Sequence, residues 1–145
     1  MTNPITNLEK FKKSPCDMIS DDRVKSLGFT NEIPKPDAPN GPGCMWKNDD
    51  FENVGIGLLN NQPLGIAGIY RNQEQGLYGY FEPVDVAGYP GVYSDAYDGR
   101  PSGACTLSVG VTDTQVFTVT TQVKSDPCER AKQAAEAALQ TMSEG

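Results

Sequence analysis

The first candidates for acid–base chemistry in this chain are its carboxylates, since the sequence contains no histidine. Without imidazole, Ser-His-Asp triads, Cys-His nucleophile pairs and histidine-containing zinc sites are excluded. Acidic residues recur close together at three places: Asp49-Asp50, Glu82 with Asp85, and Asp95 with Asp98. Paired carboxylates can hydrolyse glycosides, and converging carboxylate oxygens can bind calcium. The first and third places have the composition of turns, and no EF-hand spacing, G-x-S-x-G, G-x-G-x-x-G or P-loop motif occurs. We therefore expect no enzyme activity, no metal and no cofactor.

Tyrosine is the second residue type that points to binding. Three of the six tyrosines, Tyr89, Tyr93 and Tyr97, are spaced four residues apart in one segment. Exposed tyrosines beside Asn and Asp can stack on sugar rings or anchor a protein interface, where Tyr and Trp are enriched. Aromatic residues also favour strands, pair across hairpins and fill cores. Tyr89, Tyr93 and Tyr97 are thus a candidate binding patch, with a place in the core as the alternative.

The four cysteines, at positions 16, 44, 105 and 128, contain no C-x-x-C pair, so zinc-ribbon and thioredoxin-like spacings are absent. An even number of scattered cysteines in a small domain is typical of disulfides and an oxidising compartment; four buried thiols in a cytosolic protein are the alternative. Cys16 and Cys128 each follow a cap residue and a proline, which places them in the first turn of a helix. Of the three pairings we favour Cys16–Cys44 and Cys105–Cys128, which join each helix start to a strand.

The elements that must position these residues follow from periodicity and punctuation. Alternation and Gly or Pro breaks predict strands at 44–47, 54–58, 80–86 and 90–94, and two more around a turn at 112–115. Helices are predicted from residue 15 to Gly28, over 64–73, and from Pro127 to about Met142, with a proline-rich loop at 31–43. The fold class is α+β: an antiparallel sheet of about six strands with N- and C-terminal helices packed on one face, and two disulfides.

Composition limits the domain organisation and the partners. With 145 residues the chain has the length of one domain, and we expect a flexible tail or tether at 1–13 and a single α+β domain at 14–145. The net charge of −7 disfavours nucleic acid and anionic lipid head groups as partners, since both require Lys and Arg to neutralise phosphate. No run approaches the length of a membrane span, and no signal peptide begins the sequence. If disulfides form, we expect an export signal upstream of these residues.

An ordered set of motifs also resembles a known family. The set comprises Ser-Pro-Cys-Asp at 14–17, Leu27-Gly28, Cys44-x-Trp46, the segment YFEPVDVAGYP at 80–90, Gly-x-Cys-x-Leu-x-Val-Gly-Val at 103–111, and Asp-Pro-Cys at 126–128 before an alanine-rich helix. This order is similar to that of the secreted actinobacterial lipoproteins catalogued as domain of unknown function 3558. The resemblance implies export, lipid attachment at an N-terminal cysteine, and a place on the outer side of the plasma membrane. No lipidation cysteine precedes Thr2, and the family supplies no catalytic residues.

The sequence therefore leads to a ranked set of functional hypotheses. The first is a non-enzymatic, extracytoplasmic lipoprotein domain of the cell envelope that acts as an accessory or protein-interaction module. Its partner would be an envelope protein or a cell-wall component, and it would meet the membrane only through a lipid anchor. The alternative is a carbohydrate- or small-ligand-binding module that uses the Tyr-rich hairpin. An enzyme that acts on cell-wall material through carboxylates is the third hypothesis.

Overall fold

A single antiparallel sheet of seven strands organises the protein, in the spatial order β1-β2-β3-β7-β6-β5-β4. The computed structural model describes residues 4–35, 38, 41–59 and 64–144. The strands are β1 (Asn31–Lys35), β2 (Gly43–Lys47), β3 (Asn53–Leu58), β4 (Tyr80–Val86), β5 (Tyr89–Asp95), β6 (Ala104–Gly110) and β7 (Val116–Gln122). β7 therefore pairs with β3 on one side and with β6 on the other, which joins the two halves of the sheet.

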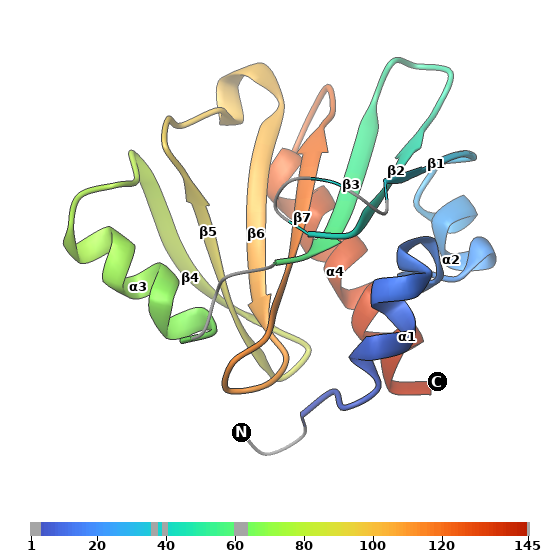
Figure 1. Ribbon diagram of the computed structural model, residues 1–145. Coiled ribbons are helices and arrows are strands. Elements are labelled where there is room, and N and C mark those ends of the chain that lie inside the picture. Colours follow the sequence, from blue (N-terminus) through green and yellow to red (C-terminus); the bar gives the residue numbers. More distant parts are fainter. Residues whose placement is uncertain (1–3, 36–37, 39–40, 60–63, 145) are drawn as a thin grey trace.

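Helices cover both faces of this sheet, although unequally (Figure 1). They are α1 (Leu8–Lys13), the 3₁₀ helix η1 (Pro15–Met18), α2 (Asp21–Ser26), α3 (Ile66–Glu74), the 3₁₀ helix η2 (Arg100–Ser102) and α4 (Pro127–Glu144). The N-terminal helices and α4 lie together on one face, as the sequence predicts, while α3 packs against Val92 and Val116 on the opposite face. Within the described ranges, no helix combines the length and the apolar character needed to cross a membrane.

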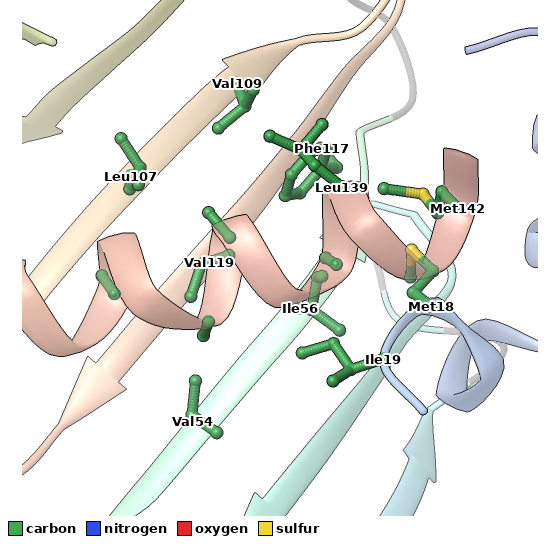
Figure 2. Close-up of a cluster of buried hydrophobic side chains, with 14 of the residues drawn as sticks. Met18, Ile19, Val54, Ile56, Leu107, Val109, Phe117, Val119, Leu139 and Met142 are labelled. Atoms are coloured by element: carbon green, nitrogen blue, oxygen red, sulfur yellow. The ribbon is translucent and has the colours of Figure 1, made fainter. Parts of the chain in front are cut away.

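The core lies between α4 and the central strands (Figure 2). Alternation along β6 and β7 sends Leu107, Val109, Phe117 and Val119 to this face, where each is fully buried. The helix faces them with small residues: Ala131, Ala134, Ala135 and Ala138 are at most 2% exposed. Because alanine has no side chain beyond Cβ, the helix axis can approach the sheet closely, and the larger Leu139 and Met142 fill the space toward η1.

Local turn chemistry accounts for the predicted hairpins. Ala87 and Gly88 connect β4 to β5 with φ values of 52° and 89°, and two positive φ values match the right-handed twist of a two-residue hairpin. The Asp85 carboxylate accepts a hydrogen bond from the Gly88 amide at 3.3 Å, which fixes this turn. The second hairpin reverses between Gly110 and Val116, as predicted.

The structure corrects the strand count, because the proline-rich segment contains a seventh strand. β1 includes Pro34 and pairs with β2 alone, so it is an edge strand. A proline is tolerated there because its missing N–H faces solvent instead of a partner strand.

The structure also differs from the tail that the sequence predicts at 1–13. Residues 8–13 form α1, and Ile5, Leu8 and Phe11 are each at most 6% exposed. The amide of Ile5 donates to the carbonyl of Val111 at 2.9 Å, which holds this segment beside the β6–β7 turn. Three apolar residues separated by polar and charged ones give too weak a pattern to predict a packed helix, and tertiary burial decides the outcome.

Both predicted disulfides are confirmed. Cys16 in η1 bonds Cys44 in β2, and Cys105 in β6 bonds Cys128 in the first turn of α4. No free cysteine remains among the four. Each bond ties a helix start to a strand, so η1 and α4 are fixed covalently to the sheet.

Replacing Cys105 with Ser should lower the free energy of unfolding by about 3.5 kcal/mol, which is the chain-entropy value for a loop of this size. Cys128→Ser should cost the same, and the double variant should cost little more, because all three remove one bond. Urea unfolding monitored by circular dichroism measures the three losses. Additive losses in the double variant would contradict a shared bond.

Candidate functional site

The three tyrosines of the predicted patch do not form one exposed surface. Tyr93 is 6% exposed and belongs to the core, whereas Tyr97, in the segment after β5, is 86% exposed. Tyr89 is half-buried and packs against the main core. The patch is therefore divided: one tyrosine is structural, one is partly covered and one is free to touch a partner.

Tyr93 is buried because both faces of β5 are covered. Val92 points to α3 and Tyr93 points to the α4 face, where its ring stacks on Tyr80 with centroids 6.5 Å apart. Burial raises the pKa of Tyr93 to about 12, and the nearby carboxylate of Glu129 adds to this shift.

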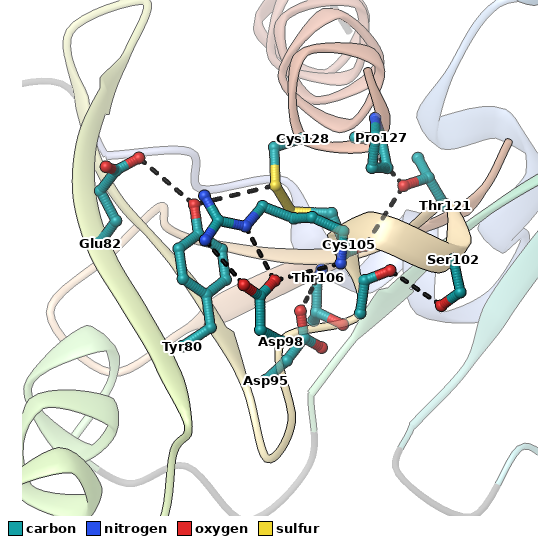
Figure 3. Close-up of a disulfide and its surroundings, with 12 residues drawn as sticks. Tyr80, Glu82, Asp95, Asp98, Ser102, Cys105, Thr106, Thr121, Pro127 and Cys128 are labelled. Carbon is teal, nitrogen blue, oxygen red and sulfur yellow. Dashed lines mark hydrogen bonds and ion pairs between the residues drawn. A yellow bond between two sulfur atoms is a disulfide. The ribbon is translucent and has the colours of Figure 1, made fainter. Parts of the chain in front are cut away.

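A cluster of charged and aromatic side chains lies beside the Cys105–Cys128 disulfide (Figure 3). The Arg100 guanidinium lies 3.9 Å from the centre of the Tyr80 ring, and it donates two 2.8 Å hydrogen bonds to the Asp98 carboxylate. These bonds lower the pKa of Asp98 to about 2. The Tyr80 hydroxyl lies 3.4 Å from Glu82 Oε2 and 3.9 Å from Cys128 Sγ. Partial burial, with the charge of Glu82, raises the pKa of Tyr80. The cluster shields the disulfide on this side.

Two of the other predicted carboxylates also have structural partners. Asp85 fixes the β4–β5 turn, and Asp95 accepts a hydrogen bond from the Thr106 amide at 3.1 Å, across the start of β6. Asp49 and Asp50 lie in the β2–β3 turn. This turn is at the same end of the sheet as the last residue of β5 and the segment that contains Asp98. Asp49, Asp50, Asp85 and Asp95 thus lie in turns or near strand ends, whereas Glu82 lies within β4.

Among the described residues, one group has the spacing of metal ligands: Cys16, Glu32 and Cys44, whose ligand atoms lie within 4.8 Å of one another. Both sulfur atoms are engaged in the first disulfide, so neither can act as a thiolate ligand in this state.

A pocket of about 170 Å³ lies on the sheet face opposite α4, beside β2, β3 and β7. Glycines leave this space open: Gly43 pairs with Gly57, and Gly55 lies opposite Thr120. A Cβ on Gly43 would lie 2.7 Å from the carbonyl oxygen of Ile56, so the close approach of β3 requires glycine at this position. The pocket is shallow, mainly apolar and partly bordered by Lys35.

Among the residues that the structure describes, the most exposed large apolar one is Phe51, at 94%, in the turn between β2 and β3. We call residues 48–52 the β2–β3 tip. Phe51 has a φ of 63°, the left-handed region that a bulky L-residue rarely occupies. The backbone conformation lowers stability, and the ring adds none because it stays in water when the chain folds, so the folded protein gains nothing from Phe51 itself.

Hydrogen bonds hold the β2–β3 tip in shape. The Asn48 side-chain oxygen accepts from the amides of Asp50 and Glu52, at 3.0 and 3.1 Å. The Glu52 carboxylate accepts from the Asn48 side-chain amide at 3.0 Å and from the backbone amide of Lys124 at 2.9 Å. The Lys124 bond and the Asn48 bond lower the pKa of Glu52. The tip is thus a rigid platform linked to the start of α4.

The β2–β3 tip is part of a larger surface at one end of the sheet. The connections from β2 to β3, β5 to β6 and β7 to α4 all lie there, at the top of Figure 1, and we call this the loop end. Phe51 and Glu52 border a hollow of about 300 Å³ with Pro101, Ser102 and Lys124. Tyr97 and Leu77, the latter 54% exposed, lie in loops of the same end.

Sequence reasoning missed Phe51. A phenylalanine among Asn48, Asp49 and Asp50 is an apolar residue in a turn composition, and that mismatch was the available signal. Its backbone conformation and its exposure could not be read from the sequence.

Comparison with known protein families matches residues 3–141 to a family model whose description is "Protein of unknown function (DUF3558)". Neither the curated proteins nor the solved structures contain a significant match to this chain.

Replacing Phe51 with Gly should raise the free energy of unfolding by about 0.5–1 kcal/mol, because glycine adopts positive φ without a Cβ clash. Phe51→Ala is the matched control: it removes the exposed ring but keeps the strained backbone, and it should lie within about 0.5 kcal/mol of wild type. Urea unfolding measures both. A glycine variant less stable than the alanine variant would contradict the strain.

Titration of the tyrosines followed by absorbance near 295 nm should show one late phase near pH 12, and Tyr93→Phe should remove it. A folded-state pKa above the unfolded value of about 10 means that stability is present below pH 10 and is lost as pH rises through 12. Tyr97→Phe is the exposed control and should leave the late phase unchanged. A late phase that survives Tyr93→Phe would contradict its burial.

Proposed function

The chain belongs to the DUF3558 family, and from this premise we propose that it is an extracytoplasmic domain of the cell envelope that acts as a non-enzymatic accessory or protein-interaction module. A lipid anchor on the N-terminal side would hold it at the outer side of the plasma membrane. Its partner would be another envelope protein or a cell-wall component.

The observation that carries this proposal is the oxidation of all four cysteines into two disulfides that fix helices to the sheet. Disulfides of this kind persist in oxidising compartments and are rare where glutathione and thioredoxin keep thiols reduced. A fold that depends on two such bonds is therefore suited to life outside the cytoplasm.

The surface supports an interaction role. Phe51 and Tyr97 are 94% and 86% exposed at the loop end, and exposed aromatic residues of this kind anchor protein interfaces. Two carboxylates of the acidic pairs support this proposal, because Asp85 and Asp95 accept backbone hydrogen bonds at a turn and at a strand end.

The position of the N-terminal segment fits an anchored module. The Ile5 amide binds the carbonyl of Val111, at the end of the sheet opposite the loop end. Strands of seven residues separate the two ends by roughly 20 Å. An anchor attached before Ile5 would thus leave the loop end facing away from the membrane.

Thiol labelling and protease accessibility in cells that express the native chain test this proposal. Without reductant, a maleimide added to lysed cells should leave the chain unmodified, and after reduction it should add four labels. Protease added outside cells stripped of their wall should degrade the chain. A cytoplasmic chain with reactive thiols, protected from that protease, would overturn the proposal.

A further inference from the structure

We infer that the β2–β3 tip is a docking element: Phe51 inserts into an apolar pocket of a protein partner, and basic side chains of that partner surround the pocket. This inference rests on the proposed interaction function and assigns it a surface, an anchor residue and a partner chemistry.

The first step is the cost of presenting Phe51. The ring is 94% exposed, and the residue has a φ of 63°, so it combines an apolar surface in water with an unfavourable backbone. Glycine or asparagine would satisfy the same turn without either cost. A large aromatic side chain in this position therefore serves something outside the folded chain.

The second step is rigidity. Asn48 and Glu52 connect the two sides of the tip through their side chains, and Glu52 also binds the backbone of Lys124 and lies 3.8 Å from the Arg130 guanidinium. The ring is thus carried by a backbone that is already ordered before a partner arrives. Preorganisation of this kind reduces the entropy lost on binding.

The third step is the chemistry of the partner. Asp49 and Asp50 precede Phe51 directly, and both are exposed. The whole chain carries a net charge of −7, so a second copy or an anionic lipid surface would be repelled. Lys or Arg residues around an apolar pocket would complement the tip and accelerate association.

The fourth step is the hollow beside the ring. Its walls come from the tip and from Pro101, Ser102 and Lys124, and its volume is about 300 Å³. A partner that receives Phe51 would place one of its own side chains in this hollow. Exchange of side chains in both directions is typical of the packed centre of an interface.

Site-specific photocrosslinking with the full chain, in the envelope of cells that express it, tests the inference. Benzoylphenylalanine replaces Phe51 in one variant and Tyr70, which is 40% exposed on α3, in the matched control. We expect one protein adduct from position 51 and none from position 70. The crosslinked partner peptide should carry apolar residues together with Lys or Arg.

Competition with unlabelled protein tests whether the adduct reports specific binding through Phe51. Excess unlabelled wild-type chain should abolish crosslinking from position 51, whereas Phe51→Ala should require about 30-fold more protein, as expected for loss of an interface anchor. Asp49→Asn combined with Asp50→Asn should compete less well, mainly at low salt. The unfolding experiments on Phe51→Ala establish separately that this competitor is folded.

Each contrary result has a distinct meaning. An adduct from position 70 alone would leave the interaction function standing and overturn the tip as its surface. An adduct with a second copy of the chain would overturn the assigned partner, as would equal competition by Phe51→Ala. No adduct from either position would overturn the tip, and the labelling and protease experiments would then decide the envelope assignment alone.

Discussion

The attachment of α4 to β6 and β7 is the constraint on which the rest of this structure depends. Alanines bring the helix close to the sheet, and the Cys105–Cys128 bond fixes its first turn to β6. The buried Thr121 hydroxyl donates to the carbonyl of Pro127 at 2.9 Å, which links the same turn to β7. Three interactions therefore act on the first turns of α4: a covalent bond, a buried hydrogen bond and an apolar contact. Together they fix the position of the helix on the sheet.

The position of α4 also constrains the loop end, because the connection from β7 to α4 contacts both neighbouring loops. The Val123 amide donates to the carbonyl of Gly103 at 2.9 Å, and the Lys124 amide donates to Glu52. Gly103 has a φ of 87°, and a Cβ there would collide with the carbonyl oxygen of Val123. The loops meet through backbone groups at close range, so the β2–β3 tip takes its orientation from the start of α4.

Much of the fold could be predicted from sequence because its signals are local. The Ala87-Gly88 turn and the proline before Cys128 each determine their structure within a few residues. β1 was missed because Pro34 argues against a strand unless the strand is at an edge, and edge position is a property of the whole sheet. Tyr93 illustrates the same limit: alternation places it on one face of β5, but only the packing of α3 and α4 shows that both faces are covered.

Both edges of the sheet are protected against pairing with another strand, whereas the β2–β3 tip is exposed. β1 carries Pro34 and charged neighbours, and β4 carries Glu82 and Pro83, so both edges resist pairing with another strand. These residues thus protect the sheet edges, where a β protein most readily associates without specificity. Phe51 differs from these protected edges, because its aromatic ring is exposed to solvent on a rigid turn of the same chain. Edges that block general association and a rigid projecting ring together favour contact with one shaped partner over contact with many.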